Sequence, residues 1–127
     1  MQRARRFRKM FGGGMRQAGI IAAGALHALE HQRARLAEDH ANAGALAQGL
    51  AELPGVEIDP ASVQTNIVLI GTPLHSAARL ASQLDMAGLR LLAVGPHTLR
   101  AVTSLMVSPE LIPGALEIFR RVLGEGR

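Results

Sequence analysis

The longest periodic pattern in the chain runs from Gln17 to Leu53, where the larger apolar residues recur at helical spacing. They are Leu26, Leu29, Leu36, Leu46, Leu50 and Leu53, with Ala43 completing intervals of three, four and seven. Three glycines inside this stretch each weaken a helix by roughly 1 kcal/mol relative to Ala, so packing has to stabilise it. The pattern predicts one long amphipathic helix, straight or bent, that ends at Pro54-Gly55.

Four short apolar runs farther along the chain predict strands. The first two cover residues 56–58 and 65–70, and the sequence of the second, TNIVLI, is a continuous apolar run of the kind that is buried on both faces of a sheet. The other two cover residues 89–94 and 98–103. They flank Gly95-Pro96-His97, which predicts a hairpin loop.

Two more helices are predicted around these strands. Residues 74–86 place Leu80 and Leu84, followed by Ala87, on one face, and Gly88 supplies a C-terminal stop. Ser108-Pro109-Glu110 resembles a helix start, although Pro113-Gly114 shifts the expected first regular turn to Pro113. The residues expected to face inward on this last helix are Ile112, Leu116, Phe119 and Leu123.

The predicted order is helix, two strands, helix, two strands, helix. It indicates an α/β fold of the α+β kind, in which a long N-terminal helix accompanies a small, mostly antiparallel sheet with helices packed on it. The length of 127 residues fits one domain. The absence of Cys excludes disulfides, thiolate zinc sites and cysteine nucleophiles. No apolar run approaches the roughly 18 residues that cross a bilayer, so we expect no membrane association.

Positive charge is concentrated at the N-terminus. Residues 1–16 hold six Arg and Lys and no acid, a net +6, whereas residues 17–127 hold eight Arg against ten Asp and Glu, a net −2. A solvated helix face, a targeting segment and a nucleic-acid arm are the alternatives for such a run. His27, and Gln17 before it, interrupt the apolar stretch that a targeting segment needs. Only three Phe and no Trp or Tyr are present, which argues against base stacking.

A fourth interpretation uses the glycines that follow the basic run. Gly12, Gly13 and Gly14 adopt backbone angles closed to other residues, and with the start of the next helix they can present N–H groups to an anion. Arg16, expected in the first turn of that helix, is badly placed for the helix dipole unless it faces a negative group. A phosphate at this loop satisfies both features.

Few side chains indicate chemistry elsewhere. His27 and His31 with Glu30 match an H-x-x-E-H zinc pattern, but the helix is Ala-rich and the chain is short for such a peptidase, so we expect a solvent-facing helix and no metal site. No Ser occupies a nucleophile elbow. Arg100 is the one cation inside an apolar strand; such an Arg either faces solvent or holds a carboxylate.

Several segments together resemble the threonine aldolases, pyridoxal-phosphate lyases of the aminotransferase-like fold type I. They are RARRFRKMFGGGMRQ, GIIAAGALHALEH, EDHANA, QTNIVL and LRAVTSLMVS, and they span nearly the whole chain. The resemblance is to the C-terminal part of the family. It implies a parent enzyme that cleaves β-hydroxy-α-amino acids to glycine and an aldehyde, with the cofactor as electron sink.

The resemblance also implies roles for individual residues. Arg16 and Lys9, with Gly13 and Gly14 of the loop between them, correspond to the family's cofactor-phosphate site, and Arg100 corresponds to the Arg that holds the substrate carboxylate. The family continues as VTHLDVS after that Arg. Ser104 and Met106 stand here in place of His and Asp, which alters the surroundings of Arg100.

The family's Schiff-base lysine lies upstream of everything that this chain matches. Lys9 is the only Lys and corresponds to the phosphate-side residue, so we expect no catalytic residue in this chain and no activity from it alone. Residues 1–16 are then a basic helix end and anion-binding loop, and 17–127 a small C-terminal domain. The resemblance implies a cytoplasmic protein that forms homo-oligomers or pairs with a missing large domain. The alternative is a small basic module that binds nucleic acid or another polyanion.

Overall fold

The computed structural model describes residues 1–125 of the chain. They fall into two compact units, Met1–Arg35 and Leu36–Arg127. The first unit contains α1 (Gln2–Met10) and α2 (Ala18–His31). The second contains α3 (Leu36–Ala51), the 3-10 turn η1 (Pro60–Ser62), β1 (Ile67–Gly71), α4 (Ala77–Met86), β2 (Leu92–Gly95), β3 (Thr98–Val102) and α5 (Leu111–Glu125).

The predicted long helix is interrupted. Residues 32–35 form turns, so the periodic stretch becomes two helices, α2 and α3. No Gly or Pro marks this break, and the prediction of a single helix was wrong there. The two helices differ in packing: α3 buries six residues in the second unit, whereas α2 buries none. Tertiary packing therefore stabilises α3 and not α2, and the hydrophobic periodicity of the sequence does not reveal this difference.

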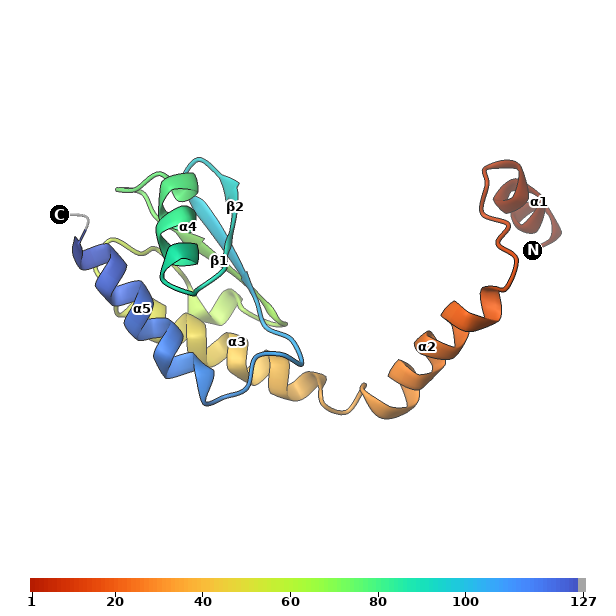
Figure 1. The fold of residues 1–127 in the computed structure, drawn as a ribbon, viewed down its shortest axis with the longest axis horizontal. Helices are drawn as coiled ribbons and strands as arrows, with labels where there is room; N and C mark the ends of the chain where they lie inside the picture. Colours follow the sequence, from red (N-terminus) through yellow and green to blue (C-terminus); the bar gives the residue numbers. More distant parts are fainter. Residues whose placement is uncertain (126–127) are drawn as a thin grey trace. The chain divides into compact units, whose positions relative to one another are not determined.

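The second unit is built on a three-stranded antiparallel sheet with β3 in the centre, in the order β1-β3-β2 (Figure 1). The hairpin between β2 and β3 is confirmed. The predicted strand at residues 56–58 is reduced to a single bridge between Glu57 and Gly71. The predicted burial of TNIVLI on both faces was also wrong, because Val68 and Ile70 are buried while Ile67 and Leu69 are exposed.

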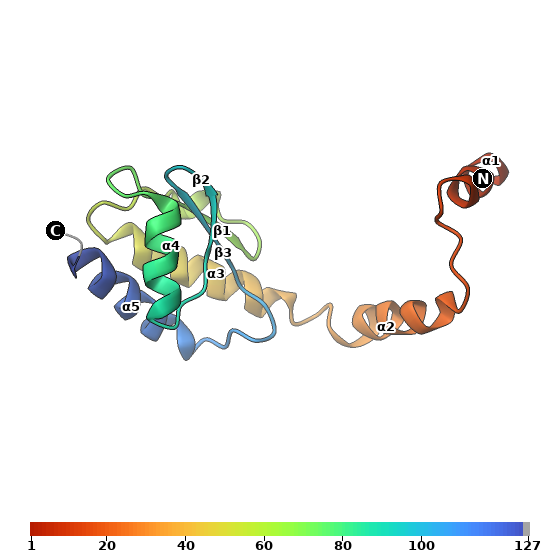
Figure 2. The same ribbon diagram turned by 45° about the horizontal axis from the view of Figure 1, so that its top comes forward.

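Three helices cover one face of this sheet. Contacts join α4 to β2 and β3, α3 to β1, and α5 to both α3 and α4, so the core lies between the helices and the sheet (Figure 2). The most deeply buried large side chains in it are Leu50, Val68, Ile70, Leu84, Leu99 and Phe119. The inward positions expected on the last helix are confirmed, with Leu116 partly buried. That helix begins at Leu111, two residues earlier than expected.

Glycine ends α4 as predicted. Gly88 has a φ of +92°, its N–H donates to the Asp85 carbonyl at 3.0 Å, and the Leu89 N–H donates to the Leu84 carbonyl at 2.8 Å. These two bonds satisfy carbonyls that the helix leaves without partners. Gly88 adopts the left-handed conformation that this turn needs, without the penalty that a Cβ would bring. The turn delivers the chain directly into the segment that leads to β2.

Two glycines of α3 are expected to respond in opposite directions to substitution. At Gly44 a Cβ would meet nothing within 4 Å, so Gly44→Ala should stabilise the second unit by roughly 0.5–1 kcal/mol through helix propensity. At Gly49 a Cβ would overlap the end of the Leu116 side chain, so Gly49→Ala forces that side chain out of its place between α3 and α5. Overpacking costs about 1–3 kcal/mol, which exceeds the propensity gain. Urea denaturation of both variants checks this, and equal stabilisation would contradict it.

Candidate functional site

Arg100 lies in the middle of β3, the central strand. Its direct cross-strand neighbours are Leu69 on β1 and Leu92 on β2, so all three side chains stand on the sheet face that the helices leave uncovered. The residue is half-buried, and its Nε atom has almost no solvent contact and no hydrogen-bond partner among the described residues. β3 therefore places one cation, Arg100, at the centre of an open sheet face.

Apolar side chains surround this guanidinium. We call the surface formed by them the open face; its large residues are Ile67, Leu69, Leu92, Val94 and Val102, each between 45% and 57% exposed. Glu57, opposite Gly71 at the edge of β1, stands on the same side of the sheet, and no ion pair joins it to Arg100. A guanidinium stays protonated at any ordinary pH, and a buried N–H without an acceptor costs about 1–3 kcal/mol. Arg100 is thus placed to bind a carboxylate or phosphate by donating its N–H groups. The apolar surroundings strengthen such a bond.

The chain just beyond β3 is fixed by buried polar residues that sequence reasoning did not single out. The Thr103 hydroxyl donates to the Asp39 carbonyl at 2.6 Å, and the Asn66 side chain donates to the Thr103 carbonyl at 2.9 Å. Asn42 donates to the Val107 carbonyl at 2.9 Å. These bonds attach the segment after Arg100 to α3 and to the residue before β1. Their only signal in the sequence was a polar residue at the end of an apolar run.

The two positions that depart from the family pattern lie in this attached segment. The Ser104 hydroxyl accepts a long bond of 3.4 Å from the Met106 N–H, and the Met106 side chain is 83% exposed. The main chain around them is held through Thr103 and Val107 rather than through their own side chains. The Ser104 and Met106 side chains therefore contribute little to holding this segment.

The glycine loop in the first unit ends a helix. Gly12 has a φ of +79°, its N–H donates to the Lys9 carbonyl at 3.2 Å, and the Gly13 N–H donates to the Arg8 carbonyl at 2.7 Å. A Cβ on Gly13 would lie 2.7 Å from Arg8 Cγ, so glycine is required for the turn itself. In this structure the Gly12 and Gly13 N–H groups form the C-cap of α1.

Lys9 and Arg16 are exposed on either side of this cap, and neither forms an ion pair with a described residue. Gly14 lies beside the Lys9 stem, since a Cβ on it would be 3.4 Å from Lys9 Cγ. Arg16 precedes α2 by two residues instead of lying in its first turn, and Gln17 enters the helix with a φ of 52°. A phosphate role for Lys9, Gly13, Gly14 and Arg16 stays a prediction.

The histidine pair of α2 forms a local contact. The His27 and His31 rings stack with centroids 4.3 Å apart, and the His31 Nδ1–H donates to the His27 carbonyl at 3.0 Å. Across residues 1–125 no three His, Asp or Glu side chains gather in a group that could hold a metal ion. Within the same residues no helix has the length and apolar character needed to cross a membrane.

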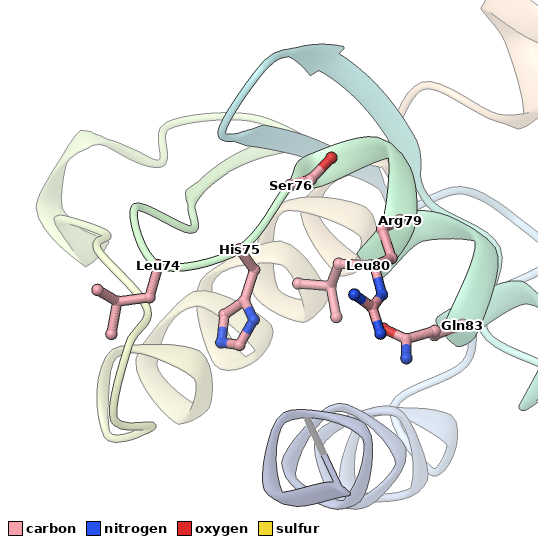
Figure 3. Close-up of a pocket in the computed structure, with 6 residues that line it drawn as sticks. All are labelled: Leu74, His75, Ser76, Arg79, Leu80 and Gln83. Atoms are coloured by element: carbon pink, nitrogen blue, oxygen red, sulfur yellow. The ribbon is translucent and has the colours of Figure 1, made fainter. Parts of the chain in front are cut away.

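A separate cavity of about 250 Å³ lies at the start of α4 (Figure 3). His75, Arg79 and Gln83 extend into the space between α4 and α5, Leu74 and Leu80 flank it, and Ser76 points away. Sequence reasoning assigned no role to any of these residues. The cavity is on the opposite side of the sheet from Arg100, because α4 packs on the covered face.

Comparison with protein families gives one match, to the beta-eliminating lyases over residues 1–72. The chain is 31% identical over 127 residues to low-specificity L-threonine aldolase 1 of Arabidopsis thaliana, covering 97% of this chain and 35% of that protein. It is 40% identical over 110 residues to the low specificity L-threonine aldolase of Escherichia coli strain K12, covering 87% of this chain and 32% of that protein. The chain thus spans about a third of the length of these curated relatives.

Solved structures resemble the fold at lower sequence identity. MppP soaked with the product 2-ketoarginine matches with a TM-score of 0.60 at 18% identity, over 76% of this chain and 30% of that one. Plasmodium falciparum ornithine delta-aminotransferase matches with a TM-score of 0.57 at 19% identity, over 72% of this chain and 25% of that one. At this identity the likeness concerns the fold alone, and it confirms the α/β architecture expected from the sequence.

Proposed function

Because the chain belongs to the beta-eliminating lyase family, we propose that it is the C-terminal part of a pyridoxal-phosphate-dependent threonine aldolase. The parent activity is cleavage of β-hydroxy-α-amino acids to glycine and an aldehyde. Sequence identity to two aldolases over nearly the whole chain supports this assignment. The observation that carries it in the second unit is the buried, unpartnered Nε of Arg100 at the centre of the open face.

Arg100 holds the substrate carboxylate in this proposal. A carboxylate accepts two parallel N–H bonds from a guanidinium, which fixes the orientation of an amino acid as well as its charge. Leu69 and Leu92 on either side give that bond an apolar border. The role of Arg100 is therefore binding and orientation of the substrate, and the bond that breaks lies elsewhere in the substrate.

Lys9 and Arg16 fit the phosphate end of the cofactor through their side chains. Both are exposed cations without a described acidic partner, and Gly14 leaves room beside Lys9. The Gly12 and Gly13 N–H groups donate to main-chain carbonyls of α1 in this structure, so the proposed phosphate contact is argued from the two cationic side chains. When bound, pyridoxal phosphate supplies the electron sink for bond cleavage at the amino acid. This chain would supply charge neutralisation at the phosphate.

Covalent attachment of the cofactor needs a lysine other than the one that contacts its phosphate. Lys9 is the only lysine of the sequence, and we assign it to the phosphate, so the chain lacks a lysine for covalent attachment of pyridoxal phosphate. The covalent bond to the cofactor requires a lysine amine of lowered pKa. Lys9 lies exposed in the last turn of the basic helix α1. We propose that the chain has no aldolase activity by itself.

The test is a direct assay of the purified chain. Incubation with L-allo-threonine and pyridoxal phosphate is expected to release no acetaldehyde above the buffer blank, and borohydride reduction followed by mass spectrometry should find no stoichiometric adduct at Lys9. The Escherichia coli aldolase assayed alongside serves as the positive control. Turnover by the chain, lost in Lys9→Gln, would refute the proposed division of roles between Lys9 and a lysine outside the chain.

Location and assembly belong to the same proposal. A small-molecule amino acid is the substrate, the protein is cytoplasmic, and the second unit functions next to a large domain or another copy that covers the open face. The polyanion-binding alternative rests on α1, whose basic side chains are exposed and form no ion pair with the described residues. The near-absence of aromatic residues gives it less support than the family assignment.

A further inference from the structure

The cavity at the start of α4 combines cationic and apolar lining. Its volume is about 250 Å³, and its lining residues are Leu74, His75, Ser76, Arg79, Leu80 and Gln83. His75 is half-buried, and the Leu80 side chain forms the floor with only 2% exposure. The cavity is therefore a shaped depression with polar groups on one wall, not a flat charged surface.

The polar side chains in it have unused hydrogen-bonding capacity. In Figure 3 the His75 ring, the Arg79 guanidinium and the Gln83 amide project into the same space above α5. Arg79 forms no ion pair within the described residues, and the His75 ring has no hydrogen bond there; the hydrogen bonds at His75 involve its main-chain N–H and carbonyl. Three side chains with N–H donors thus line one volume, and no carboxylate lines it with them.

Neighbouring cavities extend the same electrostatic character along the contact between α4 and α5. One of about 430 Å³ shares Leu74 and His75 and adds Arg120, and another of about 320 Å³ shares Gln83 and adds Arg121. No Asp or Glu among the described residues lines any of the three. Arg120 is bonded to Glu117 at 2.8 Å, whereas Arg79 and Arg121 form no ion pair with a described residue; of these two, Arg79 lines the cavity that holds His75.

We propose that the His75–Arg79 cavity binds the oxyanion group of a small molecule, a phosphate or a carboxylate. The guanidinium gives a fork of two N–H bonds to such a group, and the imidazole and the Gln83 amide complete its coordination. Leu74 and Leu80 contact the apolar part of the ligand. The cavity size suits a group of a few heavy atoms. This site lies on the covered side of the sheet and does not depend on the aldolase assignment.

The experiment is a residue-resolved NMR titration of the full chain. Inorganic phosphate and, separately, succinate are added at constant ionic strength and pH, with sodium chloride as the balancing salt. Saturable shifts are expected at the Arg79 amide, the His75 ring and the Gln83 side-chain amide, with half-saturation at about 1–10 mM. Saturation by phosphate alone identifies a phosphorylated ligand, by succinate alone a carboxylate, and by both a general oxyanion site.

Two variants decide whether the cavity is responsible. Arg79→Gln is expected to weaken binding about tenfold, because it removes the charged fork. Arg90→Gln is the matched control: this Arg follows α4, is bonded to Asp85 at 3.0 Å and lines none of the three cavities, so binding should be unchanged. Linear shifts without saturation, shifts confined to the basic α1, or equal affinity in Arg79→Gln and the parent chain would overturn the proposal.

Discussion

Replacement of Arg100 with glutamine is expected to lower kcat/KM about 100-fold in an aldolase that uses this chain. Loss of one partner from a desolvated charge pair costs roughly 2–5 kcal/mol, and each 1.36 kcal/mol is about a factor of ten. The effect should be this large because the Nε of Arg100 is buried and the open face offers no other cation among the described residues.

The assay requires a complete active site. A chimera in which this chain replaces the matching third of the Escherichia coli aldolase provides one, since the two are 40% identical over 110 residues. Cleavage of L-allo-threonine by the chimera and its variants is measured from acetaldehyde release. Arg100→Lys should retain part of the activity, because the charge remains but the planar fork is lost. Arg90→Gln should behave like the parent chimera.

Near-parent activity of Arg100→Gln would contradict the carboxylate role while leaving the family assignment in place. The two results are separable because the parent chimera is itself expected to turn over. Loss of activity in Arg90→Gln as well would indicate a general effect of removing positive charge. A rise in KM without a fall in kcat would show that Arg100 contributes equally to substrate and transition-state binding.

The second large effect concerns the core. Phe119→Ala in α5 should lower the free energy of unfolding of the second unit by about 3–5 kcal/mol, because the ring is 1% exposed and its removal leaves a cavity among the helices and the sheet. Domains of this size have a total stability of roughly 5–15 kcal/mol, so a large part of it is lost. Urea denaturation followed by circular dichroism at 222 nm measures the change.

Phe11→Ala is the matched control for that substitution. The same change of side chain is made at a residue that is 83% exposed, in the other unit, so we expect a difference within about 0.5 kcal/mol. Comparable losses at the two positions would mean that Phe11 is covered by contacts formed in solution. A loss at Phe119 below about 1 kcal/mol would show that the core around α5 is not packed as described.

Much of the second unit follows from local signals in the sequence. Gly88 ends α4 because a left-handed residue is needed there, the hairpin at Pro96 and His97 joins β2 to β3, and Phe119 faces inward on α5. Each depends on a few neighbouring residues. The break between α2 and α3 and the exposure of Leu69 could not be predicted, because both depend on which surfaces other elements cover.

Part of the candidate site could also be predicted from local signals in the sequence, and part could not. Arg100 was identifiable because a cation inside an apolar strand is unusual, and its buried Nε agrees with a binding role. The capping role of Gly12 and Gly13 could not be predicted, because glycines that cap a helix and glycines that bind an anion have the same composition, and only the structure shows the bonds to the Lys9 and Arg8 carbonyls. His75 and Arg79 gave no signal, since neither has a distinctive spacing from any other polar residue.

Because of the open face, the stability of the chain and its solubility depend on different residues. Its aliphatic residues are exposed in the folded state, so they remain available to other molecules however rarely the chain unfolds. A variant such as Gly44→Ala raises the folded fraction and does nothing to this surface. Stabilisation alone will therefore leave the solubility of the chain unchanged. A second polypeptide over the sheet, or polar substitutions at Ile67 and Val102, would instead reduce the apolar area that the open face exposes.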